Sequence, residues 1–176
     1  MALVRPRLTD FYGVLISQDE FDFAIPFLDE DIPFYVDPFL LWKSPSQQDN
    51  ALHTALIDSF NHIGFLANSG KSGEAVGRVI HASECSEVGL GFSAKRKGTR
   101  IGPKLASRIV SLFTQIPQVK KSGFSHVEEI QLFVGEISRD RISDLTCTFL
   151  KSFLIDYTIE QCRKYGIPLV DVEIRD

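Results

Sequence analysis

Apolar side chains that recur every three or four residues constrain the fold of this chain more than any other feature of its sequence. Between residues 49 and 67 they form one stripe: Leu52, Leu56, Phe60, Ile63 and Leu66. This spacing predicts an α-helix with one buried face, which Ser46 or Asp49 can cap at its start. The same pattern predicts a shorter helix over about 73–83 and another from Pro103, because proline is tolerated at the first helical position.

The longest predicted helix runs from about Ser143 to Lys164. Its apolar residues cover a broad face: Leu145, Phe149, Leu150, Phe153, Leu154 and Tyr157. A face of this breadth indicates burial against several neighbours, so we expect this helix to be the central one. Residues 126–134 are apolar enough to form a further helix that packs on the core.

Short apolar runs between the helices predict a small β-sheet. Residues 32–37 combine aromatic and β-branched side chains between prolines, which is typical of a strand that ends at Asp37. Residues 167–175 alternate well enough for another strand, and 11–17 and 87–93 are compatible with extended segments. The predicted fold class is therefore α+β: a helix-rich single domain, residues 1–176, with a small sheet packed against four or five helices.

The composition argues against a membrane protein and against a disulfide-rich secreted protein. No run of about 18 apolar residues is present, so we expect no membrane-spanning helix, and no signal peptide is visible at the N-terminus. The three cysteines, Cys85, Cys147 and Cys162, are widely spaced and form neither a disulfide framework nor a metal-binding C-x-x-C pair. These features predict a protein of the reducing cytoplasm.

Positive charge is concentrated in the segment from Val88 to Val127, which contains no acidic residue although the whole chain has a formal net charge of -4. Its basic residues are Lys95, Arg96, Lys97, Arg100, Lys104, Arg108, Lys120 and Lys121. Such an imbalance predicts the type of partner and not the fold. The partner is a phosphate-bearing molecule, an acidic protein or the acidic part of the chain itself.

Three carboxylates are the candidate metal ligands and catalytic groups: Asp37, Asp140 and Asp144. Glu128 and Glu129 lie on the preceding predicted helix. Carboxylates brought together can hold Mg²⁺ or Mn²⁺, and such an ion beside a basic tract places water against a phosphodiester in many nucleases. In the alternative interpretation, Asp37 caps a turn, Asp140 pairs with Arg139 or Arg141, and Asp144 complements a helix dipole.

The four histidines are scattered along the chain, and nothing in their spacing indicates a metal site. His53 and His62 fall nine residues apart in one predicted helix, which is not the i, i+4 spacing of a metal-binding pair. No arrangement of Ser, His and Asp or of Cys and His is apparent, so nucleophilic catalysis is not expected.

Three motifs in the chain resemble motifs of an uncharacterised group of bacterial proteins. They are Asp31-Ile-Pro-Phe-Tyr-Val-Asp37-Pro38, the Gly-Leu-Gly-Phe-Ser segment that leads to Gly102-Pro103, and Asp140-Arg-Ile-Ser-Asp144-Leu-Thr146. The resemblance covers most of residues 27–165, and the members of the group are often longer than this chain. It implies a bacterial or phage-related cytoplasmic protein and is compatible with a truncated chain, but it implies no activity.

Together these patterns predict a domain that engages nucleic acid or phosphate, as part of a metal-dependent nuclease-like or phage-defence-related bacterial protein. The predicted phosphate contacts come from one group of residues: Lys95, Arg96, Lys97, Arg100, Lys104 and Arg108. The alternative is a non-enzymatic interaction domain that uses the same basic tract to bind an acidic protein. Steep salt dependence on any polyanion would distinguish the first from the second.

Overall fold

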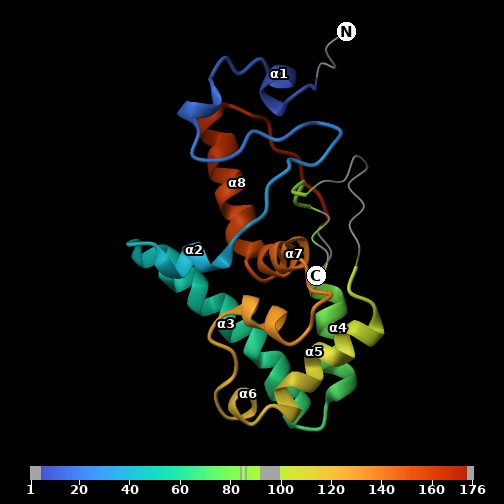
Figure 1. The fold of residues 1–176 in the computed structure, drawn as a ribbon. Coiled ribbons are helices and arrows are strands. Elements are labelled where there is room, and N and C mark those ends of the chain that lie inside the picture. Colours follow the sequence, from blue (N-terminus) through green and yellow to red (C-terminus); the bar gives the residue numbers. More distant parts are fainter. Residues whose placement is uncertain (1–4, 84, 86, 92–99, 174–176) are drawn as a thin grey trace.

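The computed structural model describes residues 5–83, 85, 87–91 and 100–173, in which all regular secondary structure is helical (Figure 1). The helices are α1 (Leu8–Tyr12), η1 (Gln18–Glu20), α2 (Pro38–Lys43), α3 (Gln47–Asn68), α4 (Ser72–Ala82), α5 (Pro103–Gln115), α6 (Pro117–Ser122), η2 (Val127–Leu132), α7 (Arg139–Phe149) and α8 (Lys151–Tyr165). Those labelled η are 3-10 helices. No helix of these residues is long and apolar enough to cross a membrane.

The core is built around α3, which contacts α2, α4, α5 and α7. The predicted stripe faces this core, and Leu56 and Phe60 are completely buried. The Phe60 ring lies 5.4 Å from that of Phe113 in α5 and 5.6 Å from that of Phe124, measured between centroids. Rigid rings therefore occupy the centre of the bundle, where their burial supplies a large part of the hydrophobic stabilisation.

Three helices begin and end close to their predicted bounds. The pattern over 49–67 corresponds to α3, the pattern over 73–83 to α4, and the helix expected from Pro103 to α5. Ser46 is the N-cap of α3, where its hydroxyl accepts a hydrogen bond from the Asp49 N–H at 3.3 Å. All three segments carry a clear apolar period, and α3 and α5 also carry a local start signal in Ser46 and Pro103, which is why the sequence alone located them.

The predicted β-sheet is wrong, because the described residues contain only isolated bridges. Ile32 pairs with Leu90 through two backbone hydrogen bonds of 2.8 Å, from Ile32 N–H to the Gly89 carbonyl and from Gly91 N–H to the Ile32 carbonyl. The next available donor, the Phe34 N–H, turns back to the Ile32 carbonyl at 2.7 Å and ends the ladder. Residues 167–173 likewise form no strand, so the fold of the described chain is all-α and not α+β.

The single long helix predicted from Ser143 to Lys164 is also wrong. The chain leaves the helical conformation at Leu150 (φ -100°, ψ 13°), which separates α7 from α8. α7 stays on the core, whereas α8 extends away from it beside the N-terminal segment (Figure 1). There the Tyr165 ring packs against Phe21 at a centroid distance of 4.5 Å. Only Leu145, Phe149 and Leu150 of the predicted apolar face therefore belong to the core or pack against it, and α3 is the central helix.

Candidate functional site

Three segments that are distant in the sequence meet at the start of α7. The bridge between Ile32 and Leu90 joins residues 31–32 to residues 89–91. Four residues after Ile32, the Val36 N–H donates a hydrogen bond to the Ser143 hydroxyl of α7 at 2.9 Å. These contacts hold the segment after Asp31 between the Gly89–Gly91 loop and α7.

Asp31, Asp140 and Asp144, which we call the acidic cluster, gather at this junction. Asp140 and Asp144 lie four residues apart in α7 and therefore share one side of the helix. A Cβ atom added at Gly91 would lie 3.2 Å from Asp140 Oδ1 and 3.8 Å from Asp31 Oδ2, so both carboxylates border this glycine. Gly91 has φ of 126°, a conformation that other residues rarely adopt.

The acidic cluster is electrostatically strained. Burial, followed by the negative charges of Asp140 and Asp31, raises the pKa of Asp144 to about 7. The carboxylates of Asp140 and Asp144 form no hydrogen bond or ion pair with another described residue. A cation beside these carboxylates would stabilise the ionised form of Asp144, because opposite charge and desolvation act on its pKa in opposite directions.

The described residues contain no group of three His, Cys, Asp or Glu side chains arranged to hold a metal ion. Mg²⁺, however, is usually held by one or two carboxylates and takes its remaining ligands from water and substrate phosphates. Asp140 and Asp144 therefore fit this mode of binding, in which the protein supplies only part of the coordination shell.

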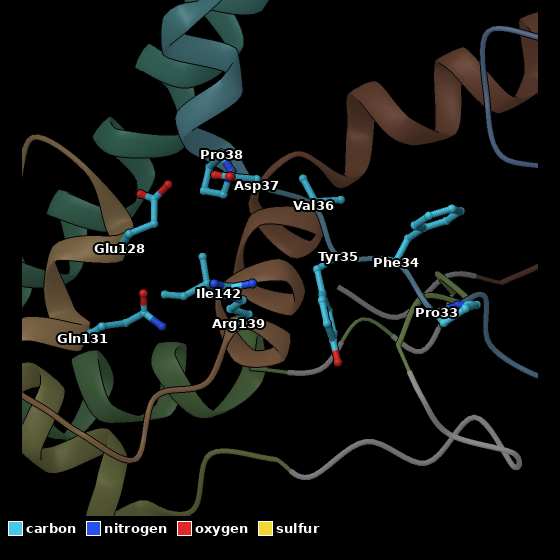
Figure 2. A pocket seen from close by; sticks show the side chains of 10 residues that line it. All are labelled: Pro33, Phe34, Tyr35, Val36, Asp37, Pro38, Glu128, Gln131, Arg139 and Ile142. Carbon is cyan, nitrogen blue, oxygen red and sulfur yellow. The ribbon is translucent and has the colours of Figure 1, made fainter.

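Asp37, the third ligand predicted from the sequence, has a different set of neighbours. It is the N-cap of α2, and its Oδ1 accepts a hydrogen bond from the Phe39 N–H at 3.1 Å. Its carboxylate lies on the same side of a pocket as that of Glu128 in η2 (Figure 2). Asp37 is therefore a helix cap, as the alternative interpretation predicted. The third carboxylate beside Asp140 and Asp144 is that of Asp31.

Half of the predicted phosphate-binding residues can be placed. Lys95, Arg96 and Lys97 lie outside the described residues. Lys104 is exposed in the first turn of α5, and Arg100 is exposed just before it.

Arg108 is already engaged by an acidic neighbour. It forms an ion pair and hydrogen bond with Glu136, and this hydrogen bond is the main reason that the pKa of Glu136 is lowered. The Lys104 side chain is therefore more available than that of Arg108 to bind an external phosphate.

The sequence of residues 13–176 matches the family described as Domain of unknown function (DUF8370). The chain belongs to this family. The DUF8370 match includes the acidic cluster and the complete basic tract. No curated protein matches the chain, and no solved structure does so either.

In this DUF8370 member, sequence reasoning grouped Asp140 with Asp144 but did not find Asp31. The helical spacing of four shows that the first two share a side, whereas Asp31 arrives through the pairing of Ile32 with Leu90. No pattern of residue spacing along the chain predicts that pairing. The one available signal was that Asp31, Gly91 and Asp140 all stand in the three motifs of the resemblance.

Proposed function

We propose that this chain engages the phosphate groups of a nucleic acid through the basic residues from Lys95 to Arg108, with Mg²⁺ or Mn²⁺ beside the acidic cluster. The main support is a juxtaposition: Gly91, which borders Asp31 and Asp140, directly precedes the segment that carries Lys95, Arg96 and Lys97. This arrangement suits a metal-dependent nuclease-like or defence-related protein of the bacterial cytoplasm, where its three free cysteines stay reduced.

In this proposal, acidic residues of the chain would hold the metal, and basic residues would bind the phosphate backbone. Asp140 and Asp144 would hold part of the metal's coordination shell from one side of α7, and the buried position of Asp144 favours pairing with a cation over solvation. Lys104 and the basic residues before it would fix the phosphate backbone. When bound, the metal supplies charge neutralisation and an activated water at the phosphodiester.

A second function, a non-enzymatic interaction domain, is favoured by a different observation. Large apolar side chains are exposed on α2 and η2, with Leu40 at 65% exposure, Trp42 at 45% and Leu132 at 80%. Large exposed apolar side chains are typical of protein contact surfaces when they form one patch. In this case the basic tract would bind an acidic partner and would show little affinity for nucleic acid.

Anisotropy titrations of labelled single-stranded and duplex oligonucleotides at several salt concentrations test the first function. Removal of two charges in Lys95→Ala/Lys97→Ala should weaken binding and reduce the slope of log K against log salt by roughly 1–2. The matched control is Lys120→Ala/Lys121→Ala, because these residues lie on α6, well away from the Gly89–Gly91 loop (Figure 1). Equal losses in both variants, or no binding by the wild type, would contradict the proposal.

Thermal melts with EDTA and with millimolar Mn²⁺ test the metal. A cation that binds only the folded state raises the melting temperature by mass action, and Asp140→Asn or Asp144→Asn should remove this gain. Asp37→Asn is the control, because Asp37 faces Glu128 and not the acidic cluster. If Mn²⁺ left the melting temperature of the wild type unchanged, the metal would be removed from the proposal. Phosphate binding by the basic residues would then be the part that remains.

A further inference from the structure

A pocket of about 470 Å³ lies between segment 33–38, η2 and α7 (Figure 2). Its volume falls within the ~300–1,000 Å³ that is usual for small-molecule sites. Segment 33–38 forms one wall, Glu128 and Gln131 of η2 form a second, and Arg139 and Ile142 of α7 form the third. The hydrogen bond from Val36 N–H to the Ser143 hydroxyl fixes the first wall to the third. The pocket is therefore a feature of the packed fold.

Glu128 presents a buried carboxylate without a hydrogen-bonding partner to this pocket. Both of its side-chain oxygens are almost completely buried, and neither accepts a well-aligned hydrogen bond from the described residues. Its neighbour Glu129 points the other way and caps η2, accepting hydrogen bonds from the backbone N–H groups of Ser125 at 3.0 Å and His126 at 2.8 Å. Buried side-chain atoms without a hydrogen-bonding partner also occur at Thr148 and Gln161 among the described residues, but of the three only Glu128 lines this pocket. Desolvation of an unpaired carboxylate is costly.

Asp37 adds a second negative charge beside Glu128. Burial is the main cause of the raised pKa of Glu128, and the charge of Asp37 raises it further. The backbone N–H groups of Glu128 and Phe39 and the nearby His126 oppose this effect only in part. One lining residue, Arg139, is cationic, but it is exposed and forms no ion pair with either carboxylate. The carboxylates of Asp37 and Glu128 thus form no ion pair with a described residue.

We propose that this pocket binds an organic cation, whose ammonium or guanidinium group lies between the carboxylates of Asp37 and Glu128. Such a group donates several hydrogen bonds and can satisfy both Glu128 oxygens. The stem of the cation would lie along Pro38 and Ile142, which line the same pocket. This site is independent of the proposed nucleic-acid function.

A bare metal ion fits the pocket less well than an organic cation. Only two carboxylates line it, and one oxygen of Asp37 already accepts a hydrogen bond from Phe39 N–H. A volume of about 470 Å³ also far exceeds the space of one water, about 30 Å³ in the liquid. An alkyl chain with a charged end uses both the volume and the apolar walls.

Calorimetric titration with butylguanidinium tests this proposal, and neutral butylurea is the matched ligand control because it has the same shape without the charge. Loss of a charge-assisted hydrogen bond in Glu128→Gln should weaken binding by about tenfold or more. Glu129→Gln makes the same change of charge one residue away and should bind as the wild type does, since Gln also serves as a helix cap. Far-UV circular dichroism checks that both variants keep the fold.

The capped peptide acetyl-Gly-Gly-Arg-Gly-Gly-amide distinguishes two sources of the cation. Tighter binding of the peptide than of butylguanidinium, with the same loss in Glu128→Gln, identifies an arginine side chain of a protein as the occupant. Tighter binding of butylguanidinium identifies a free small molecule. The proposal is overturned if neither ligand binds at millimolar concentration, if butylurea binds equally well, or if Glu128→Gln leaves the affinity unchanged.

Discussion

The imidazole rings of His53 and His126 are in direct contact, with His53 Nε2 only 3.1 Å from His126 Nδ1. His53 belongs to α3 and is 7% exposed, whereas His126 immediately precedes η2. The ring of Trp42 in α2 packs edge-on against His126 at 5.1 Å. When both rings are neutral, one nitrogen donates and the other accepts, so the pair joins α3 to the segment before η2, and this hydrogen bond is lost once both rings are protonated.

Stability should therefore fall as the pH is lowered below about 6.5, the usual pKa of histidine. Burial, followed by the charge of His126, lowers the pKa of His53 in the folded state. The unfolded chain then binds the proton more tightly, and the free energy of unfolding decreases as the pH falls through this window. Urea denaturation at about pH 7.5 and pH 5.5 should show a smaller decrease for His53→Gln than for the wild type. The exposed His81 in α4 is the control, and an equal decrease in His53→Gln would contradict the explanation.

Asp144 should produce the opposite dependence on pH. Its pKa is about 7 in the folded protein against a usual value of 3.8, so the folded state binds the proton more tightly and loses stability as the pH rises between these values. Asp144→Asn should stabilise the protein by about 1–2 kcal/mol near pH 8, allowing for solvent screening, and should have little effect near pH 4. Denaturation curves at both pH values check this, with the exposed Asp156→Asn in α8 as control. If Asp144→Asn instead lowered the stability at pH 8, the ionised carboxylate of Asp144 would be stabilised by its surroundings in the folded protein.

Gly64 allows α3 and α5 to approach closely. A Cβ atom there would lie 2.2 Å from Cδ1 of Phe113, whose side chain is only 1% exposed in the core. Gly64→Ala should destabilise the protein by about 1–3 kcal/mol through overpacking, despite the better helix propensity of alanine.

Gly77 of α4 is the matched control, because a Cβ atom there meets nothing within 4 Å. Gly77→Ala should therefore stabilise the protein by about 0.5–1 kcal/mol. The two changes in melting temperature should have opposite signs. A gain of stability in both variants would mean that Phe113 can yield.

Asn61 should be required for the turn that follows α6. Its side chain donates to the Phe124 carbonyl and accepts from the Phe124 N–H, both at 2.9 Å, and so satisfies a backbone segment that enters the core. Asn61→Ala should cost about 1–3 kcal/mol because it leaves these groups unpaired. Urea denaturation measures the loss, and Gln118→Ala on the exposed surface of α6 should change stability by less than about 0.5 kcal/mol.

The sequence by itself determined the features that depend on local order along the chain. The apolar period over α3, the proline that starts α5 and the spacing of Asp140 and Asp144 each act within a few turns of helix, so they could be predicted. The same reasoning failed for segment 32–37, because its strand-like composition needs a continuous partner and the Phe34 N–H is instead used within the segment.

Only the tertiary structure decided which distant groups meet. The pairing of Ile32 with Leu90 brings Asp31 to the acidic cluster, and the packing of α2 against η2 brings Asp37 to Glu128. The break at Leu150 likewise sends α8 to the N-terminal segment and leaves α3 at the centre of the core. The energies of these contacts depend on burial and on distances of a few ångströms, because charges and unpaired polar groups act strongly only where water is excluded. The order of residues along the chain contains no measure of either quantity.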